Sequence, residues 1–215
     1  MEQVEYAELY RLQDRVLETV FRGETSFYLT GGTCLHRFYH GLRHSDDLDF
    51  FTNEVNLFRE DSRILRGRLE SSDIVYKLVV DSRDFIRLLA DGSLKIDLVN
   101  DRVYRSGGSR ILDNGIRLDN IGNILANKLC AVLGRDEPKD VFDICVIAVR
   151  ETVDWQSVME DCGRKCDFDR EALAYRLSSF PLELFDLLPC TDKNFLAKLK
   201  TDYRSIIGGI LRGIL

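Results

Sequence analysis

A short stretch near the N-terminus joins a glycine turn with a hydroxyl side chain to two aspartates one residue apart. Phe27-Tyr28-Leu29 predicts a short strand that runs into Thr30-Gly31-Gly32-Thr33. Residues 34–39 have helical character, and the run from Asp47 to Phe51 predicts a second strand. The order predicts a strand, a tight turn, a short helix and another strand, so helices and strands are mixed in the first half of the chain.

The aspartates of the second strand indicate a metal site. Asp47 and Asp49 are separated by Leu48, so on a strand both carboxylates point to the same face. Two like charges about 4 Å apart repel by roughly 4 kcal/mol at an effective dielectric near 20, which a fold tolerates if a divalent cation lies between them. Oxygen ligands favour Mg²⁺ or Mn²⁺.

The glycine turn is typical of a phosphate site. A glycine pair between a strand and a helix lets backbone N–H groups approach an anion, and the Thr33 hydroxyl could bind a phosphate oxygen. Taken alone, Gly32 and Thr33 are better explained as an ordinary tight turn. Combined with the two aspartates, and with Arg43 and Ser45 in between, they favour phosphate chemistry on metal ions.

A third carboxylate lies downstream. In the run Leu94–Val99, alternation places Lys95 and Asp97 on one face of a predicted strand. If this strand lies beside residues 47–50, Asp97 joins the first two aspartates, and three carboxylates can hold two metal ions. Asp97 would be the general base or would ligate the metal that activates the nucleophile. The alternative is a solvent-facing aspartate on a strand.

These motifs resemble the nucleotidyltransferases of the DNA polymerase β superfamily, and within it the AbiEii/AbiGii-type toxins, which include the MenT toxins. The superfamily pattern of a glycine turn, a spacer and Asp-x-Asp is matched by Gly32, Thr33, Asp47 and Asp49. A later block is similar to the family's second motif and consists of Ile124 to Ala131, Arg135, Lys139, Asp140 and Asp143. The resemblance covers residues 27 to about 150.

The resemblance implies an α+β fold: a polymerase-β-like nucleotidyltransferase core with a mixed β-sheet and flanking helices, followed by a helical C-terminal part. It implies transfer of a nucleoside monophosphate from an NTP to an acceptor hydroxyl, with RNA, at a tRNA 3′ end, as the acceptor. The protein would then be the toxin of a toxin–antitoxin pair and have a cognate antitoxin. A small-molecule nucleotidyltransferase of the antibiotic-modifying type and a catalytically silent NTP-binding regulator are the alternatives.

Three residues of the later block bear on the site. Lys128 is a lone charge in an apolar helical run, so it either snorkels to the surface or binds an anion. The resemblance favours triphosphate binding by Lys128 and makes Asp140 a site residue. Asp143 is interpreted as a helix-packing partner. Arg43 and Ser45 complete the expected NTP-binding set.

The pattern of elements changes near residue 118. Helices are predicted over Glu5–Phe21 and Asn53–Glu70, and strands over Ile74–Val80, Phe85–Ala90 and Leu94–Val99. Beyond Asp119 all the predicted elements are helices, over 120–133, 139–149, 155–161, 170–177 and 194–211. We therefore predict a nucleotidyltransferase core over residues 1–118 and a helical domain over 119–215.

The net charge of −6 at pH 7 argues against broad binding to nucleic acid and leaves room for a local basic patch. Arg102, Arg105 and Arg110 fall in a glycine-containing loop after the third carboxylate, where they could reach a bound substrate. The helical row of Arg59, Arg63 and Arg66 is interpreted as a solvated face.

The sequence also bears on the cellular compartment of the protein and on possible zinc sites. No signal peptide and no long apolar segment are recognised, so we expect a cytoplasmic protein without a membrane partner. Six cysteines without a paired framework fit reduced thiols. A zinc site at Cys162 and Cys166 is disfavoured because no second Cys or His pair follows. A zinc site at His36, His40 and His44 is disfavoured because the helix that would align them ends at Gly41.

Overall fold

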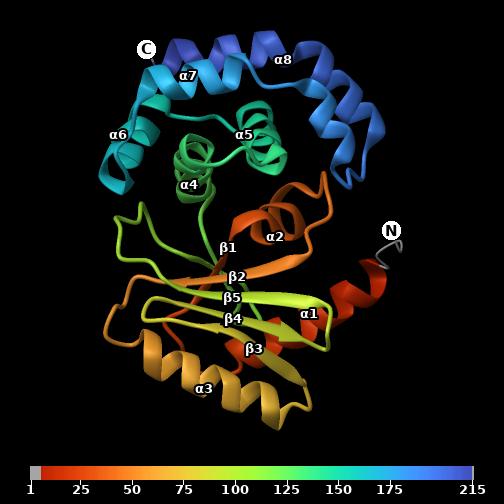
Figure 1. The fold of residues 1–215 in the computed structure, drawn as a ribbon, viewed down its shortest axis with the longest axis vertical. Helices are drawn as coiled ribbons and strands as arrows, with labels where there is room; N and C mark the ends of the chain where they lie inside the picture. Colours follow the sequence, from red (N-terminus) through yellow and green to blue (C-terminus); the bar gives the residue numbers. More distant parts are fainter. Residues whose placement is uncertain (1–5, 215) are drawn as a thin grey trace. The chain divides into compact units, whose positions relative to one another are not determined.

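The computed structural model describes residues 6–214, which form two compact units (Figure 1). The first unit contains the chain up to Cys34 and residues 46–102 and 109–119. The second contains residues 35–45, 103–108 and the chain from Asn120 onward. The predicted core over residues 1–118 included 35–45 and 103–108, which the structure places in the second unit. Arg43 of the first segment donates to Asp143, and the backbone of Tyr104 and Ser106 in the second bonds to the side chains of Lys165 and Asn123.

The first unit is built on a mixed seven-stranded sheet of order β3-β4-β5-β2-β1-β7-β6. Its strands are β1 (Tyr28–Thr30), β2 (Asp47–Thr52), β3 (Tyr76–Asp81), β4 (Phe85–Ala90), β5 (Leu94–Asn100), β6 (Arg110–Ile111) and β7 (Arg117–Leu118). β2 and β5 are parallel, as are β1 and β7, whereas the other pairs are antiparallel. The predicted α+β class with a mixed sheet is confirmed.

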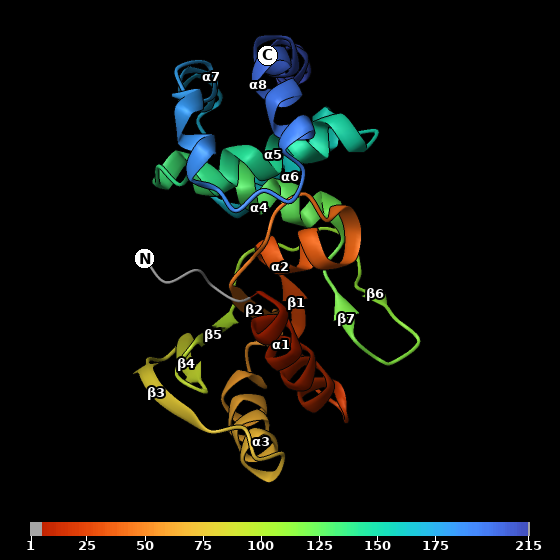
Figure 2. The same cartoon turned by 90° about the vertical axis from the view of Figure 1, so that its right-hand side faces the viewer.

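Two helices pack against each other and against β5: α1 (Tyr6–Phe21) and α3 (Phe58–Ser71) (Figure 2). Strand alternation explains which side of the sheet they cover. Leu48 and Phe50 of β2 are buried, and the Phe50 ring lies 5.9 Å from that of Phe21 in α1. The aspartates of β2 therefore lie on the opposite face.

Several predicted bounds differ from the structure. Helix α3 begins at Phe58 rather than at Asn53, because Tyr28 donates to the Asn53 side chain at 3.1 Å and the Asn53 amide donates to the Asp101 carbonyl at 2.8 Å. Glu5, in the first predicted helix, lies outside the described residues. The two-residue strands β6 and β7 were not predicted, since so short a run has no periodicity.

The turn after β1 is helical from its first glycine. Helix α2 (Gly31–Leu35) continues as a π-helical turn over His36–His40. Gly41 then has a φ of 67°, a left-handed conformation that ends the helix, as predicted.

The second unit consists of helices in the part of the chain that the structure describes beyond Asn120. These are α4 (Ile121–Gly134), α5 (Pro138–Arg150), α6 (Trp155–Lys165), α7 (Arg170–Ser178), a 3₁₀ turn over Leu182–Leu187 and α8 (Lys193–Ile214). Phe142 of α5 packs against the rings of Phe185 and Phe195 at 5.7 and 6.4 Å. None of the helices in the described residues is long and apolar enough to cross a membrane.

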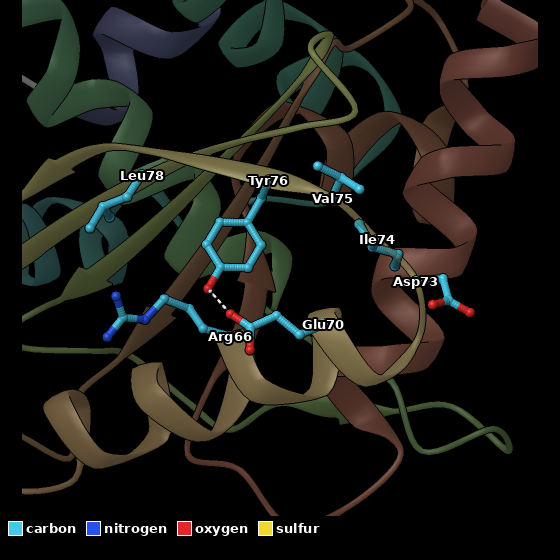
Figure 3. A pocket seen from close by; sticks show the side chains of 7 residues that line it. All are labelled: Arg66, Glu70, Asp73, Ile74, Val75, Tyr76 and Leu78. Carbon is cyan, nitrogen blue, oxygen red and sulfur yellow. Dashed lines mark hydrogen bonds between the residues drawn. The ribbon is translucent and has the colours of Figure 1, made fainter.

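An open groove lies between α3 and the edge strand β3 (Figure 3). The Tyr76 hydroxyl donates to Glu70 across this groove at 2.7 Å. The strand is largely exposed, and its pairing with β4 is irregular between Leu78 and Val80. The groove contains none of the predicted site residues.

Candidate active site

The structure brings the three predicted metal ligands together on one face of the sheet. Strands β2 and β5 are parallel and in register, with Asp49 opposite Asp97 and Asp47 opposite Lys95. The condition set in the sequence argument, that the strand of Asp97 lies beside residues 47–50, is met. Because paired residues of adjacent strands point the same way, the three aspartates share a surface that we call the carboxylate face.

Two positively charged side chains contact the carboxylate face. The Lys95 ammonium lies 2.5 Å from Oδ2 of Asp47. The Arg87 guanidinium, on β4, donates from Nε and Nη2 to the two oxygens of Asp97, each at 2.7 Å. The hydrogen bonds that Arg87 donates to Asp97, more than the negative charge of Asp97, raise the pKa of Arg87. Sequence reasoning placed Lys95 on this face but missed Arg87, whose signal is a single charged residue in an alternating apolar strand.

The carboxylate face has the donor chemistry of a magnesium or manganese site, since all three side chains offer oxygen. No group of three or more His, Cys, Asp or Glu side chains converges as a metal site in the described residues. Lys95 and Arg87 contact two of the carboxylates, those of Asp47 and Asp97. The assignment of Asp47, Asp49 and Asp97 as metal ligands stays a prediction.

The glycine turn is fitted closely to the carboxylate face. Gly31 has a φ of 71°, and a Cβ at this position would collide with the Asp49 carboxylate. Gly32 and Thr33 are buried, and the Thr33 hydroxyl donates to the backbone carbonyl of Asp47. Gly31 was not among the predicted site residues, although its place in the glycine pair is the signal for it.

The second unit holds a buried group of charged side chains, the ion-pair cluster, made up of His36, Arg43, Lys128, Arg135, Asp140 and Asp143. The Lys128 ammonium lies 2.7 Å from both Asp140 and Asp143. Lys128 therefore does not snorkel: its charge is held in the interior by two carboxylates. Helix α4 supplies the lysine and the start of α5 supplies both aspartates, so this cluster joins the two helices.

Further cations complete the cluster. Arg43 donates from Nε and Nη2 to the two oxygens of Asp143, at 2.8 and 2.7 Å. Arg135 donates to Asp140 at 2.7 Å, and His36 lies 2.8 Å from Asp143 through its Nε2. Asp143, expected only as a packing partner, is thus the centre of a buried charge network.

The cluster shifts the pKa values of its members. Burial alone would raise the pKa of Asp143, but Arg43 and Lys128 outweigh burial and hold that pKa well below its usual range. Burial would also lower the pKa of Lys128, yet its two aspartates raise it. Burial dominates for His36 and lowers its pKa despite Asp143, which keeps the imidazole neutral near pH 7.

The remaining predicted residues lie as follows. Ser45 is buried at the end of the 35–45 segment, in the second unit. Arg102 donates to Asp84 through Nε and Nη2, at 2.9 and 2.7 Å. Arg102 and Arg110 belong to the first unit and Arg105 to the second, so the predicted arginine loop is divided between them. The roles of these residues stay predictions.

The profile of one protein family, described as nucleotidyl transferase AbiEii toxin of a type IV toxin–antitoxin system, matches residues 15–214. The chain belongs to this family. As an AbiEii-family protein it is a nucleotidyltransferase of the toxin–antitoxin class, which confirms the resemblance inferred from the motifs. A comparison with curated proteins gave no match.

Solved structures agree with the fold of this AbiEii-family chain. JHP933 from Helicobacter pylori has 20% identity and a TM-score of 0.61, over 99% of this chain and 94% of that one. MenT4, a nucleotidyltransferase toxin from Mycobacterium tuberculosis, has 15% identity and a TM-score of 0.60, over 97% and 87% of the two chains. At these identities the similarity shows the fold alone.

Proposed function

We propose that this AbiEii-family toxin uses a divalent metal, Mg²⁺ or Mn²⁺, to transfer a nucleoside monophosphate from an NTP to the 3′ hydroxyl of a tRNA. The bond between the α- and β-phosphates of the NTP breaks, and pyrophosphate leaves. The observation that carries the proposal is the register of β2 and β5, which places Asp97 opposite Asp49 on the face that also bears Asp47. We further propose that a cognate antitoxin restrains the enzyme in the cytoplasm, where NTP and tRNA are both found.

In this mechanism the chain's own residues position the reactants. The metal, when bound, would neutralise charge on the triphosphate and lower the pKa of the attacking hydroxyl. Asp47, Asp49 and Asp97 would hold it, and Asp97 would also be placed to accept the proton of the acceptor hydroxyl. Backbone N–H groups of Gly32 and Thr33, at the start of α2, would bind phosphate oxygens.

The ion-pair cluster supports the proposal that the second unit contributes to NTP binding. With His36 neutral, the cluster contains the cations Arg43, Lys128 and Arg135 against the carboxylates Asp140 and Asp143. Its surplus positive charge favours an anion such as a triphosphate. We therefore propose that Arg43, Ser45 and Lys128 assist NTP binding, with Asp140 holding Lys128 in place.

The net charge of −6 favours a second candidate, transfer to a small-molecule hydroxyl, because an acidic protein attracts RNA weakly. Purified protein incubated with each labelled NTP and total tRNA, with and without Mg²⁺, separates the two. Label should move into tRNA only with metal, and not with Asp49→Ala, whose fold is checked by circular dichroism. Full transfer by Asp49→Ala would refute the active-site assignment, and transfer only to small hydroxyl compounds would favour the second candidate.

A further inference from the structure

Arg87 binds both carboxylate oxygens of Asp97 on the carboxylate face. It lies on β4 directly opposite Asp97 and occupies one lone pair on each carboxylate oxygen, at 2.7 Å. The arginine side chain is 37% exposed, whereas that of Asp97 is 10% exposed. The arginine is therefore the more solvent-accessible partner of the pair.

The same face holds a second ion pair, between Lys95 and Asp47. The face thus carries three carboxylates and two positive side chains. A divalent cation that binds these carboxylates has to share them with the cations already present, and each positive charge repels it.

From this geometry we propose that Arg87 is a positioning residue that sets the metal affinity of the site: it orients Asp97 and competes with the divalent cation for it. The inference rests on the proposed function, in that the carboxylate face is the metal site. A carboxylate has about four lone-pair sites, so Asp97 can keep Arg87 and still offer an oxygen to a metal. Arg87 would then orient the Asp97 carboxylate and lower the affinity of that carboxylate for the metal ion.

Competition and orientation have different chemical requirements. Competition requires the positive charge, which lysine also supplies. Orientation requires the planar fork that binds both carboxylate oxygens, which lysine lacks. Arg87→Gln removes both properties, whereas Arg87→Lys removes only the fork, so the two variants separate the two effects.

The experiment is a calorimetric titration of Mn²⁺ into the full-length wild type, Arg87→Gln, Arg87→Lys and a control. Loss of the charge should lower the Kd for Mn²⁺ by about tenfold in Arg87→Gln, as expected for one charge removed near a divalent ion. Arg87→Lys should bind within about threefold of the wild type, since the charge remains. The control, Lys77→Gln, removes a positive charge from the neighbouring strand β3 and should leave the Kd unchanged.

Each outcome has one meaning. Equal or weaker Mn²⁺ binding by a folded Arg87→Gln overturns the inference and leaves the metal site intact. No binding by either protein overturns the metal site and the inference with it. Loss of the signal in Asp49→Ala places the bound ion at the carboxylate face.

A measurement on the wild type covers the case in which Arg87→Gln fails to fold. Titration with diamagnetic Mg²⁺ should shift the Arg87 Nε–Hε resonance with the same Kd as Mg²⁺ binding itself. Saturation with Mg²⁺ without any shift of that resonance would overturn the inference.

Discussion

Lys128 lies between two carboxylates in the interior of the second unit, and this position changes what its loss would do. Deletion of a snorkelling lysine removes only contacts of its aliphatic stem. Deletion of a buried lysine leaves Asp140 and Asp143 facing each other with one fewer cation between them. The residue therefore contributes to folding whether or not it also binds NTP.

We predict that Lys128→Ala lowers the free energy of unfolding by about 3–5 kcal/mol, the usual cost of breaking a buried ion pair. Urea unfolding followed by circular dichroism measures it. The control Lys139→Ala, in the first turn of α5, should change stability by less than about 0.5 kcal/mol. A loss below about 1 kcal/mol for Lys128→Ala would show that the cluster is dispensable for folding.

Stability should also depend on pH through His36. The folded state lowers the pKa of His36, so below about pH 6.5 the unfolded state binds more protons than the folded state. The free energy of unfolding therefore decreases as the pH is lowered. The pKa of Asp143 is also depressed, which adds a second loss below about pH 4. Urea unfolding from pH 8 to 3 should show both losses. His36→Gln should flatten the loss between pH 7 and 5, and an unchanged slope there would exclude His36 as its source.

At the scale of elements, alternation along 47–51 and 94–99 showed which residues of each strand share a face, with Asp47 and Asp49 on one strand and Asp97 on the other. That the two strands are neighbours was only a condition of the sequence argument, and the pairing of β2 with β5 meets it. Arg87 could not be assigned in the same way. Its contact depends on the register between β4 and β5, which sequence periodicity does not specify.

The ion-pair cluster shows the same limit. The Lys128 position in an apolar helix and the acidic start of α5 were both visible in the sequence. Their partner Arg43 comes from a segment about a hundred residues away, and only the folded chain shows that it bonds to Asp143. Local patterns therefore predicted the elements well and the long-range ion pairs poorly.

The predicted RNA contacts can now be separated by element. Arg102 donates to Asp84, and Arg110 begins the short strand β6. If Arg105 and Arg110 contact tRNA phosphates, replacing either with alanine should weaken tRNA binding. Each replacement should also reduce the slope of log K against log salt concentration by about 0.7 to 0.9. Filter binding at several salt concentrations measures the slopes, and variant slopes equal to that of the wild type would remove Arg105 and Arg110 from the acceptor site.

For the whole molecule, the order of the chain makes the second unit discontinuous. The segment 35–45 provides Arg43 and His36 to the fully buried Asp143 of α5. A division of the protein at residue 118 separates these partners. The two predicted domains are therefore not two independent pieces of chain.

We predict that a fragment of residues 119–215 does not fold cooperatively. Without Arg43 and His36 it leaves a buried carboxylate short of partners, at a cost of about 3–5 kcal/mol against a typical stability of about 5–15 kcal/mol. Thermal melting by circular dichroism should show a broad transition for the fragment and a sharp one for the full chain. Asp143→Asn in the fragment should restore part of the lost cooperativity, and a sharp transition in the unmodified fragment would contradict the prediction.

The edge strand β3 affects the tendency of the protein to aggregate in concentrated solution. Leu78, Val79 and Val80 are exposed at the outer edge of the sheet, where unpaired backbone groups can template cross-β aggregation. The flanking charges of Lys77 and Asp81 and the irregular pairing within the strand are the features that oppose such growth. Three apolar residues are thus kept from seeding fibrils by two charges and one local distortion.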